Sequence, residues 1–408
     1  MSETIRNLMN KVRQKAAPQM AIIDEIALEN QRKVLNAFRL NRVADRHFKG
    51  STGYGYDDIG RDTLCRLYAD VFHAEAALVS PLITGGTHAL VLALFGLLRP
   101  GDTLLSITGA PYDTLYQAII GEGSGSMREY GISYEQVDLK GDSFDFEGIQ
   151  AHLTAKLPKV IFITRSRGYS ERNALSIQAI GECIRHIRSI APNVWIVVDN
   201  CYGEFCEIQE PTDVGADLCV GSLIKNIGGG LAPTGGYVVG KKELVDHIAY
   251  RFIAPGLGNE VGSYEGGYRM FYQGLFMAPH TVACSLKGSL LFAHAFEEIG
   301  FKVVPASSAP MGDIIRSICF DTAEQLVAFI QSIQAAAPVD SHVVPEPWDM
   351  PGYQDPVIMA AGSFVGGASI ELSADAPVRP PYIAYLQGAL TYEHAQIAVE
   401  DALRAILK

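Results

Sequence analysis

The sequence has few of the features that mark secreted, metal-binding or membrane-spanning proteins. Its seven cysteines are scattered and odd in number, and no two of them form a CxxC pair. This argues against a disulfide framework and predicts no metal site. No run of 18 apolar residues is present, so we expect no membrane span. Residues 1–20 mix charges throughout, so we expect no signal peptide and a cytoplasmic protein with reduced thiols.

Positive charge is also scarce, since 33 Lys and Arg face 45 Asp and Glu, a formal net charge of −12. That balance argues against nucleic acid or an anionic membrane as a partner. Hydrophobic residues make up 48% of the chain and charged residues 19%, which is typical of a globular protein and excludes a disordered one. At 408 residues, without internal repeats, the chain is long enough for about two domains.

Short apolar segments alternate with helical ones through the first two thirds of the chain. We expect strands at 76–79, 103–107, 132–137, 160–164, 195–198, 218–220 and 236–239. Strands that alternate with helices indicate an α/β fold with a mainly parallel sheet. Ligands of such sheets bind beyond the carboxyl ends of the strands.

The end of the chain follows another pattern. A long helix from about residue 275 leads to expected strands at 302–304, 314–319 and 369–372 and helices at 324–334 and 393–407. This predicts a smaller α+β domain. The expected division is an N-terminal helical arm at 1–50, more plausibly packed on a partner than a domain by itself, a large domain at 51–275 and a small C-terminal domain at 276–408.

Two charged residues stand where two expected strands end. Asp199 closes the apolar run Trp195-Ile196-Val197-Val198, and Lys225 follows the run at 218–220 just before a cluster of glycines. A lysine that forms a Schiff base and an acid that keeps a pyridinium nitrogen protonated are the pair that pyridoxal phosphate (PLP) enzymes use. The residues alone leave two other readings open, namely a lysine facing water and an aspartate that caps a helix or turn.

A third feature belongs to the same edge of the sheet. The turn Thr84-Gly85-Gly86-Thr87-His88 opens a helix that is apolar almost all round. Unpaired N–H groups and the dipole of a helix N-terminus favour an anion, and glycines allow a phosphate to approach the backbone. Alone this signal is weak, because glycine turns before helices are common.

Several long motifs carry a family resemblance. They are GSTGYGYDDIGRDTL, GGTHAL, VDNCYGEF, SLIKNIGGGLAPTGGY, SHVVPEPWDMPGYQDPVIMAAGSF and RPPYIAYLQGALTYEH. From about residue 50 to its end, the chain resembles fold-type-I PLP enzymes of the Cys/Met metabolism group. Within that group it is most similar to the methionine γ-lyase-like branch linked to aluminium resistance. The resemblance implies a PLP-dependent, transferase-like α/β fold.

The resemblance also implies roles for individual residues. It makes Lys225 the Schiff-base lysine, Asp199 the partner of the ring nitrogen and Tyr112 the tyrosine that stacks on the ring and serves as an acid. For the cofactor phosphate it implies Gly86, Thr87, Ser222 and, reaching over from a neighbouring subunit, Tyr56. For the substrate carboxylate it implies Ser363.

The chain departs from the group's pattern at several positions. Asp58 stands where the group has an arginine, a role that the nearby Arg61 is a candidate to fill, and Ile224 replaces a hydroxyl residue before the lysine. Ala384 or Tyr385 takes the place of the arginine that binds the substrate carboxylate. We therefore take Arg379 as the candidate for that task, with Arg165 and Arg167 as rivals.

The implied activity is that of a PLP-dependent carbon–sulfur lyase that converts a sulfur-containing amino acid into a 2-oxo acid, ammonia and a thiol. Two alternatives stay open: another PLP reaction, such as transamination, an aldol-type cleavage or a different β-elimination, and a PLP-binding protein with little turnover. The glycine-rich loop GYGYDDIG needs a surface to lie on. We expect a homo-oligomer, a dimer of dimers, with active sites shared between two chains.

Overall fold

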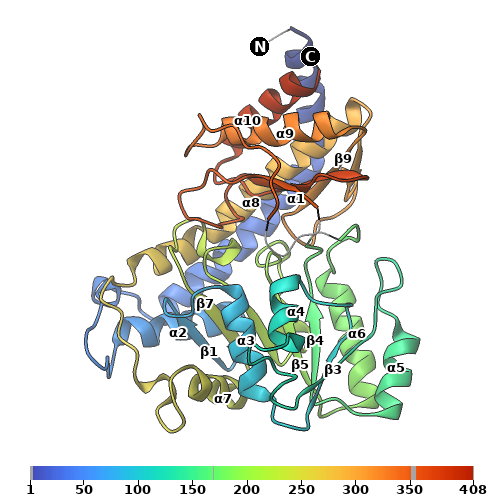
Figure 1. Cartoon of the computed structure of the whole chain (residues 1–408). Coiled ribbons are helices and arrows are strands. Elements are labelled where there is room, and N and C mark those ends of the chain that lie inside the picture. Colours follow the sequence, from blue (N-terminus) through green and yellow to red (C-terminus); the bar gives the residue numbers. More distant parts are fainter. Residues whose placement is uncertain (1–2, 169, 351–354, 408) are drawn as a thin grey trace.

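The computed structural model describes residues 3–168, 170–350 and 355–407. Its larger sheet has seven strands in the order β1-β7-β6-β5-β4-β2-β3 (Figure 1). The strands are β1 (Ala76–Ser80), β2 (Thr103–Ser106), β3 (Ser133–Gln136), β4 (Val160–Thr164), β5 (Trp195–Asp199), β6 (Leu218–Ser222) and β7 (Gly236–Gly240). The pairs from β6 to β3 are parallel, whereas β7 runs antiparallel to both of its neighbours.

Helices cover both faces of this sheet. One face packs on α3 (Gly86–Leu97), α4 (Asp113–Ile120) and α7 (Lys242–Phe252). The other face packs on α2 (Ile59–Val71), α5 (Phe146–Ala155), α6 (Ile177–Ile190) and part of α8 (Arg269–Glu298). Neighbouring residues of β5 alternate between these two cores, as Val197 and Val198 do. Burial on both faces is why the strands read as continuous apolar runs, and the predicted α/β fold is confirmed.

The smaller sheet is antiparallel throughout, in the order β10-β11-β12-β9-β8. Its strands are β8 (Lys302–Val304), β9 (Arg316–Phe320), β10 (Val357–Ala360), β11 (Ser373–Pro377) and β12 (Tyr382–Gln387). Two further helices, α9 (Ala323–Ala336) and α10 (Tyr392–Ile406), join α8 and the N-terminal helix on one face. On the opposite face Ile383 and Tyr385 contact Tyr202 of the large sheet's loops.

Sequence reasoning failed mainly in this smaller sheet. The predicted strand at 369–372 is wrong, because those residues form a turn and bend that lead into β11. The strands β10, β11 and β12 were not predicted. The segment SADAP of β11 is rich in small and acidic residues that are poor strand formers, and cross-strand pairing with β10 and β12 overrides that preference.

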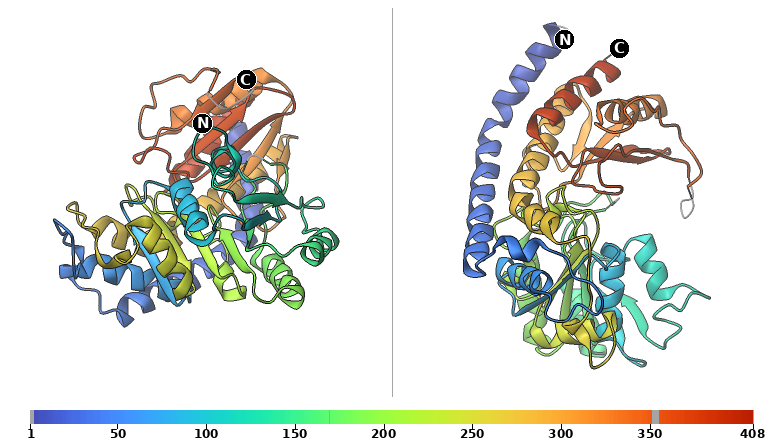
Figure 2. Two further views of the ribbon diagram at one scale, coloured as in Figure 1. Left: turned by 60° about the horizontal axis from the view of Figure 1, so that its bottom comes forward. Right: turned by 90° about the vertical axis from the view of Figure 1, so that its left-hand side faces the viewer.

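Two long helices join the sheets. Helix α1 (Glu3–Leu40) lies beside α8 over much of its length, and both termini lie at the end occupied by the small sheet (Figure 2). Ile5, Met9 and Val12 of α1 are buried in the core of that end, so the arm packs on its own chain. Its packing on a partner stays a prediction. By length and composition α8 could cross a membrane, but 78% of its apolar window is buried, as in a core helix.

Candidate active site

Asp199 and Lys225 meet at the carboxyl edge of the large sheet. Asp199 is the last residue of β5, and Lys225 follows β6, the strand paired in parallel with β5. Asp199 is 3% exposed and accepts a hydrogen bond from the Cys201 backbone N–H at 3.1 Å. Burial raises the pKa of Asp199 to about 6, although the positive charge of Lys225 and the Cys201 N–H act in the opposite direction. The carboxylate is therefore a buried negative charge that a further cation would stabilise.

The glycine turn lies next to this pair. A Cβ atom at Gly86 would lie 3.4 Å from the Ser222 Cβ and 3.6 Å from the Cys201 Sγ, so the start of α3 faces the end of β6. Gly85, the N-cap of α3, supplies no side chain to the first helical N–H groups. The Ser222 Oγ is buried and has no hydrogen-bond partner. Unsatisfied donors thus converge from two elements on one place.

Tyr112 approaches from the segment before α4. Its hydroxyl lies 2.9 Å from the Thr87 Oγ1, which ties it to the first turn of α3. Burial, followed by the negative charge of Asp199, raises the pKa of Tyr112 well above its ordinary value. The phenol is therefore protonated at neutral pH and can act as a hydrogen-bond donor or an acid. The residues at 86, 87, 112, 199, 222 and 225, all predicted from the sequence, come together in this way.

Sequence reasoning missed three residues around Asp199 and Lys225, namely Tyr202, Glu204 and Asn226. The Lys225 Nζ lies 4.0 Å from the centre of the Tyr202 ring. Asn226 is fully buried, and its Nδ2 donates to the carbonyl oxygens of Tyr202 at 2.8 Å and Glu204 at 3.0 Å. Only their place in the motif VDNCYGEF, three and five residues past the end of β5 at Asp199, could have drawn attention to Tyr202 and Glu204.

Glu204 is an unusual acid in this position. It is fully buried, and the Tyr237 hydroxyl donates to its Oε1 at 2.7 Å. Burial raises the pKa of Glu204 to about 8, although that hydrogen bond acts in the opposite direction. Glu204 therefore carries a proton at neutral pH, and it does not compete with Asp199 for a cation.

The small domain contributes the loop that contains Ser363. A Cβ atom at Gly367 of this loop would lie 3.8 Å from the Ile224 Cδ1. The loop therefore lies beside the residue before Lys225. Glu371 accepts from the backbone N–H groups of Phe364 and Val365 at 2.9 Å each and holds the loop in shape. The Ser363 hydroxyl donates to the Val365 carbonyl at 2.9 Å. Residues 351–354 of the same sequence motif lie outside the described residues.

Arg379 lies on the turn between β11 and β12. Its side chain is 60% exposed and forms an ion pair with Asp355 at 3.2 Å. Arg379 is thus an exposed arginine paired with an acid of the small domain, and its predicted role stays a prediction.

The two rival arginines are committed elsewhere. Arg165 is fully buried and pairs with Glu207 at 2.9 Å, and its Nη1 also donates to the Gly203 carbonyl. Arg167 donates to the carbonyls of Ser170 and Val304. Both guanidinium groups therefore hold loops together.

The loop at 51–58 stands apart from this cluster. Tyr56 is 60% exposed and lies against Tyr54, with ring centres 5.7 Å apart. Arg61 turns inward and donates to the Gly55 carbonyl at 2.9 Å, so it braces the loop and does not reach outward as a substitute for the missing arginine. Asp58 caps α2 by accepting from the N–H groups of residues 60 and 61.

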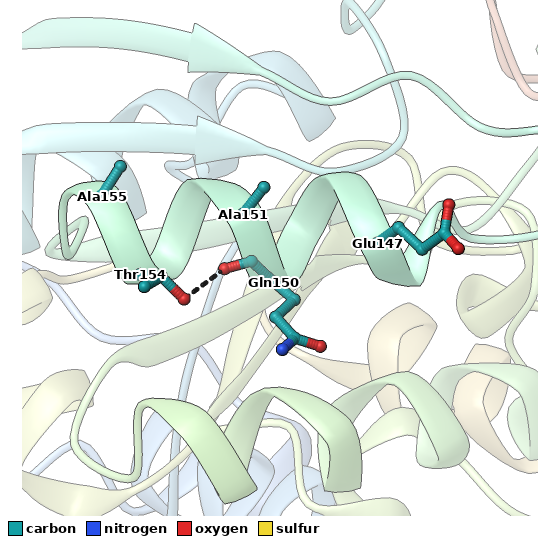
Figure 3. Close-up of a pocket in the computed structure, with 5 residues that line it drawn as sticks. All are labelled: Glu147, Gln150, Ala151, Thr154 and Ala155. Carbon is teal, nitrogen blue, oxygen red and sulfur yellow. Dashed lines mark hydrogen bonds between the residues drawn. The ribbon is translucent and has the colours of Figure 1, made fainter.

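The surface hollow along α5 is a different kind of feature. Its lining side chains come from one helix and point outward, and one contact among them is the Thr154 hydroxyl donating to the Gln150 carbonyl at 2.8 Å (Figure 3). It brings together no buried charged groups of the kind that surround Lys225. We therefore place the candidate site at the carboxyl edge of the sheet.

Known proteins are similar to this chain in both sequence and fold. The chain is 51% identical over 390 residues to the uncharacterized protein YnbB of Bacillus subtilis, covering 95% of this chain and 92% of that protein. A structure of a carbon-sulfur lyase involved in aluminum resistance from Clostridium novyi superposes with a TM-score of 0.95 at 48% identity, covering 99% and 96% of the two chains.

A more distant structure, the pyridoxal-5'-phosphate dependent protein YhfS from Escherichia coli, has a TM-score of 0.64 at 16% identity over 94% and 97% of the chains. It shows the shared fold alone, and the predicted fold-type-I architecture is confirmed. The family profile described as methionine gamma-lyase matches residues 5–407. The predicted resemblance is confirmed, and the chain belongs to the methionine gamma-lyase family.

Proposed function

We propose that this protein is a PLP-dependent carbon–sulfur lyase that acts on a sulfur-containing amino acid. The observation that carries the proposal is the meeting of Lys225 and Asp199 with the open N-terminus of α3, in a chain of the methionine gamma-lyase family. The similarity to a carbon-sulfur lyase of Clostridium novyi supports the same reaction class. The carbon–sulfur bond would break, and with the uptake of one water the products would be a 2-oxo acid, ammonia and a thiol.

The residues at the site fit the proposed cofactor. The first N–H groups of α3 lack intrahelical acceptors, and the unpartnered Ser222 hydroxyl lies beside them, as a phosphate requires. A side chain at Gly86 would fill the space between them. Asp199 is a buried carboxylate that would hold a protonated pyridine nitrogen. Lys225 would bind the cofactor covalently, and the cofactor would supply an electron sink for the α-carbon of the amino acid.

The protein's own groups would handle the protons. Lys225 acts electrostatically on the Asp199 carboxylate, and as a free base it would take the α-proton. Tyr112 is a neutral phenol at physiological pH and would hand its proton to the departing thiolate. The Thr87 hydroxyl holds Tyr112 in place for this task. Ser363 and Arg379 from the small domain would hold the substrate carboxylate.

We also propose that the active sites are shared in a homotetramer, a dimer of dimers. Tyr56 is exposed on a braced loop and would reach the phosphate of a neighbouring subunit. The seven cysteines are free thiols, and six of them are buried, which supports a proposed cytoplasmic location.

The test of the proposed function is direct. Purified protein supplied with PLP and reduced with borohydride should yield a peptide that carries the cofactor on Lys225, identified by mass spectrometry. Lys225→Ala should bind PLP only noncovalently and lose turnover. Lys159→Ala, which changes a surface lysine, should keep covalent PLP binding and normal turnover. The native enzyme should release a 2-oxo acid and a thiol from at least one member of a panel of sulfur-containing amino acids. An adduct on another lysine would refute the proposal.

A further inference from the structure

The side chains of Tyr202 and Lys225 are in close contact, and this contact has no role in the reaction proposed above. The Lys225 Nζ lies 4.0 Å from the centre of the Tyr202 ring. An ammonium group over the face of an aromatic ring is attracted by the negative charge of the π-system, and the attraction is stronger where water is excluded. Both residues are partly buried, so little bulk water competes for the ammonium.

Tyr202 is held in this position from two directions. Its carbonyl accepts a hydrogen bond at 2.8 Å from the Nδ2 of Asn226, the residue that directly follows Lys225. The side chain of the residue after Lys225 is thereby bonded to the backbone of Tyr202. The Tyr202 side chain also packs against the small-domain cluster of Ile315, Ile383 and Tyr385. The ring is therefore fixed relative to the lysine and to the domain that carries Ser363.

Other titratable groups also act on Lys225. They lie on the segment before α4, at the end of β5 and in the loop that follows it, and they are Tyr112, Asp199, Cys201, Tyr202 and Glu204. Burial by itself lowers the pKa of Lys225, but the hydroxyl group of Tyr202, followed by Cys201 and Asp199, outweighs it and raises the pKa above the ordinary value. The contact with the face of the Tyr202 ring is a further, geometric observation. A lysine in that state is charged at neutral pH.

We propose that Tyr202 is a positioning residue for Lys225, whose ring holds the lysine ammonium inside the site before the cofactor is bound and after the released amine has taken up the α-proton. This inference rests on the proposed function, in which the amine must leave the cofactor and later return to it. The ring serves as a resting place that keeps the amine near its reaction partner. Tyr112 has a separate task, because its hydroxyl is tied to Thr87.

The experiment measures the proton affinity of Lys225 without any cofactor. Cofactor-free protein is labelled with trace acetic anhydride over a range of pH, and mass spectrometry gives the acetylation rate of each lysine. Loss of the ring in Tyr202→Leu should lower the pKa of Lys225 by about one unit, so that its acetylation at a fixed pH below that pKa becomes about tenfold faster. Tyr202→Phe keeps the ring but loses the hydroxyl, so its Lys225 pKa should lie between those of wild type and Tyr202→Leu.

The same samples contain a matched control. The Lys159 Nζ lies 3.9 Å from the centre of the Trp195 ring, away from the site, and its acetylation should not change in any Tyr202 variant. If Tyr202→Leu does not fold, Tyr202→Met removes the ring with a similar side-chain volume. Lys225 acetylation that stays within twofold of wild type in the folded ringless variant would overturn the role of Tyr202.

A second readout separates this inference from the proposed function. Borohydride reduction of wild-type protein with PLP tests whether Lys225 binds the cofactor at all. A missing Lys225 adduct would overturn the proposed function, and the inference with it, whatever the acetylation result. A normal adduct with unchanged acetylation would overturn the positioning role alone. A normal adduct, faster acetylation in the ringless variant and slower capture of PLP by that variant would support both.

Discussion

At the scale of single residues, the candidate site holds polar groups in surroundings that are unfavourable for them. Ser222 has a buried hydroxyl without a partner, and Asp199 has a buried carboxyl whose pKa is raised to about 6. Such groups cost stability, and they persist where a ligand can satisfy them. Both residues therefore give predictions that compare stability with cofactor affinity.

Ser222→Ala should separate these two quantities. Removing a buried hydroxyl that lacks a partner should raise the free energy of unfolding of the cofactor-free protein by about 1 kcal/mol. It should also lower PLP affinity by roughly tenfold, because a hydrogen bond to a charged phosphate is lost. Ser317 in β9 also has a buried, unpartnered hydroxyl, so Ser317→Ala should raise stability and leave PLP affinity unchanged. Urea unfolding and fluorescence titration measure both, and equal affinity in the two variants would contradict the phosphate role of Ser222.

Asp199→Asn should change the pH dependence of stability. The carboxyl has an ordinary pKa of 3.8 and a folded pKa of about 6, so the folded cofactor-free protein holds a proton that the unfolded chain releases between these values. Its stability should therefore fall as the pH rises through that window, by about 3 kcal/mol in all. The asparagine variant should lack this fall.

The measurement is urea unfolding of cofactor-free wild type and variant at pH 4.5 and pH 7.5. A difference in free energy of unfolding between the two pH values that is the same for both proteins would contradict the buried-acid reading of Asp199. With PLP bound, Asp199→Asn should lower turnover far more than it lowers cofactor affinity, because the pyridine nitrogen loses the charge that keeps it protonated.

At the scale of elements, Asp58 decides how α2 begins and where the preceding loop lies. It accepts from the backbone N–H groups of Gly60 and Arg61 at 3.0 Å and from the Tyr268 hydroxyl at 2.7 Å. Asp58→Ala should therefore remove a helix cap and leave a buried phenol without an acceptor, at a cost of about 2–3 kcal/mol.

Asp145→Ala is the matched control for this change. Asp145 caps α5 by accepting from the Gly148 N–H at 2.9 Å, and its loss should cost about 1 kcal/mol. Urea unfolding of the two variants compares them. An Asp58 variant as stable as the Asp145 variant, with a large loss of PLP affinity, would mean that Asp58 acts on the cofactor and not on the helix.

At the scale of the whole molecule, the exposed Tyr54–Tyr56 loop predicts a shared site. Mixed Lys225→Ala and Tyr56→Phe chains should recover activity, because a mixed dimer has one site with both the lysine and the tyrosine intact. With random exchange in an equal mixture, half of the dimers are mixed and recovery should reach about a quarter of the wild-type rate.

Mixing Lys225→Ala with Asp199→Asn provides the negative control. Both residues lie in the site of one chain, so each site of the mixed dimer stays defective. Native mass spectrometry would establish subunit exchange in both mixtures. Absence of recovery in the first mixture despite proven exchange would show that Tyr56 serves its own chain.

The sequence by itself determined the features that depend on local order. The apolar runs at 195–198 and 218–220 became β5 and β6 because strands buried on both faces must be apolar throughout. Asp199, Lys225 and the turn before α3 were predictable as one cluster, because parallel strands end at the same edge of a sheet. The long motifs predicted the family, which the comparisons confirm.

Only the tertiary structure decided what depends on residues far apart in the chain. β11 forms from a poor strand sequence because β10 and β12 flank it. Arg165 and Arg167 look like anion binders in the sequence, but partners distant in the chain occupy them, Glu207 in one case and Val304 in the other. The place of Tyr202 in its motif does not reveal its partner, since the contact with Lys225 arises when the loops after two neighbouring strands meet. Strand ends follow from local pattern, whereas the partner of each side chain is set by how the strands and domains pack.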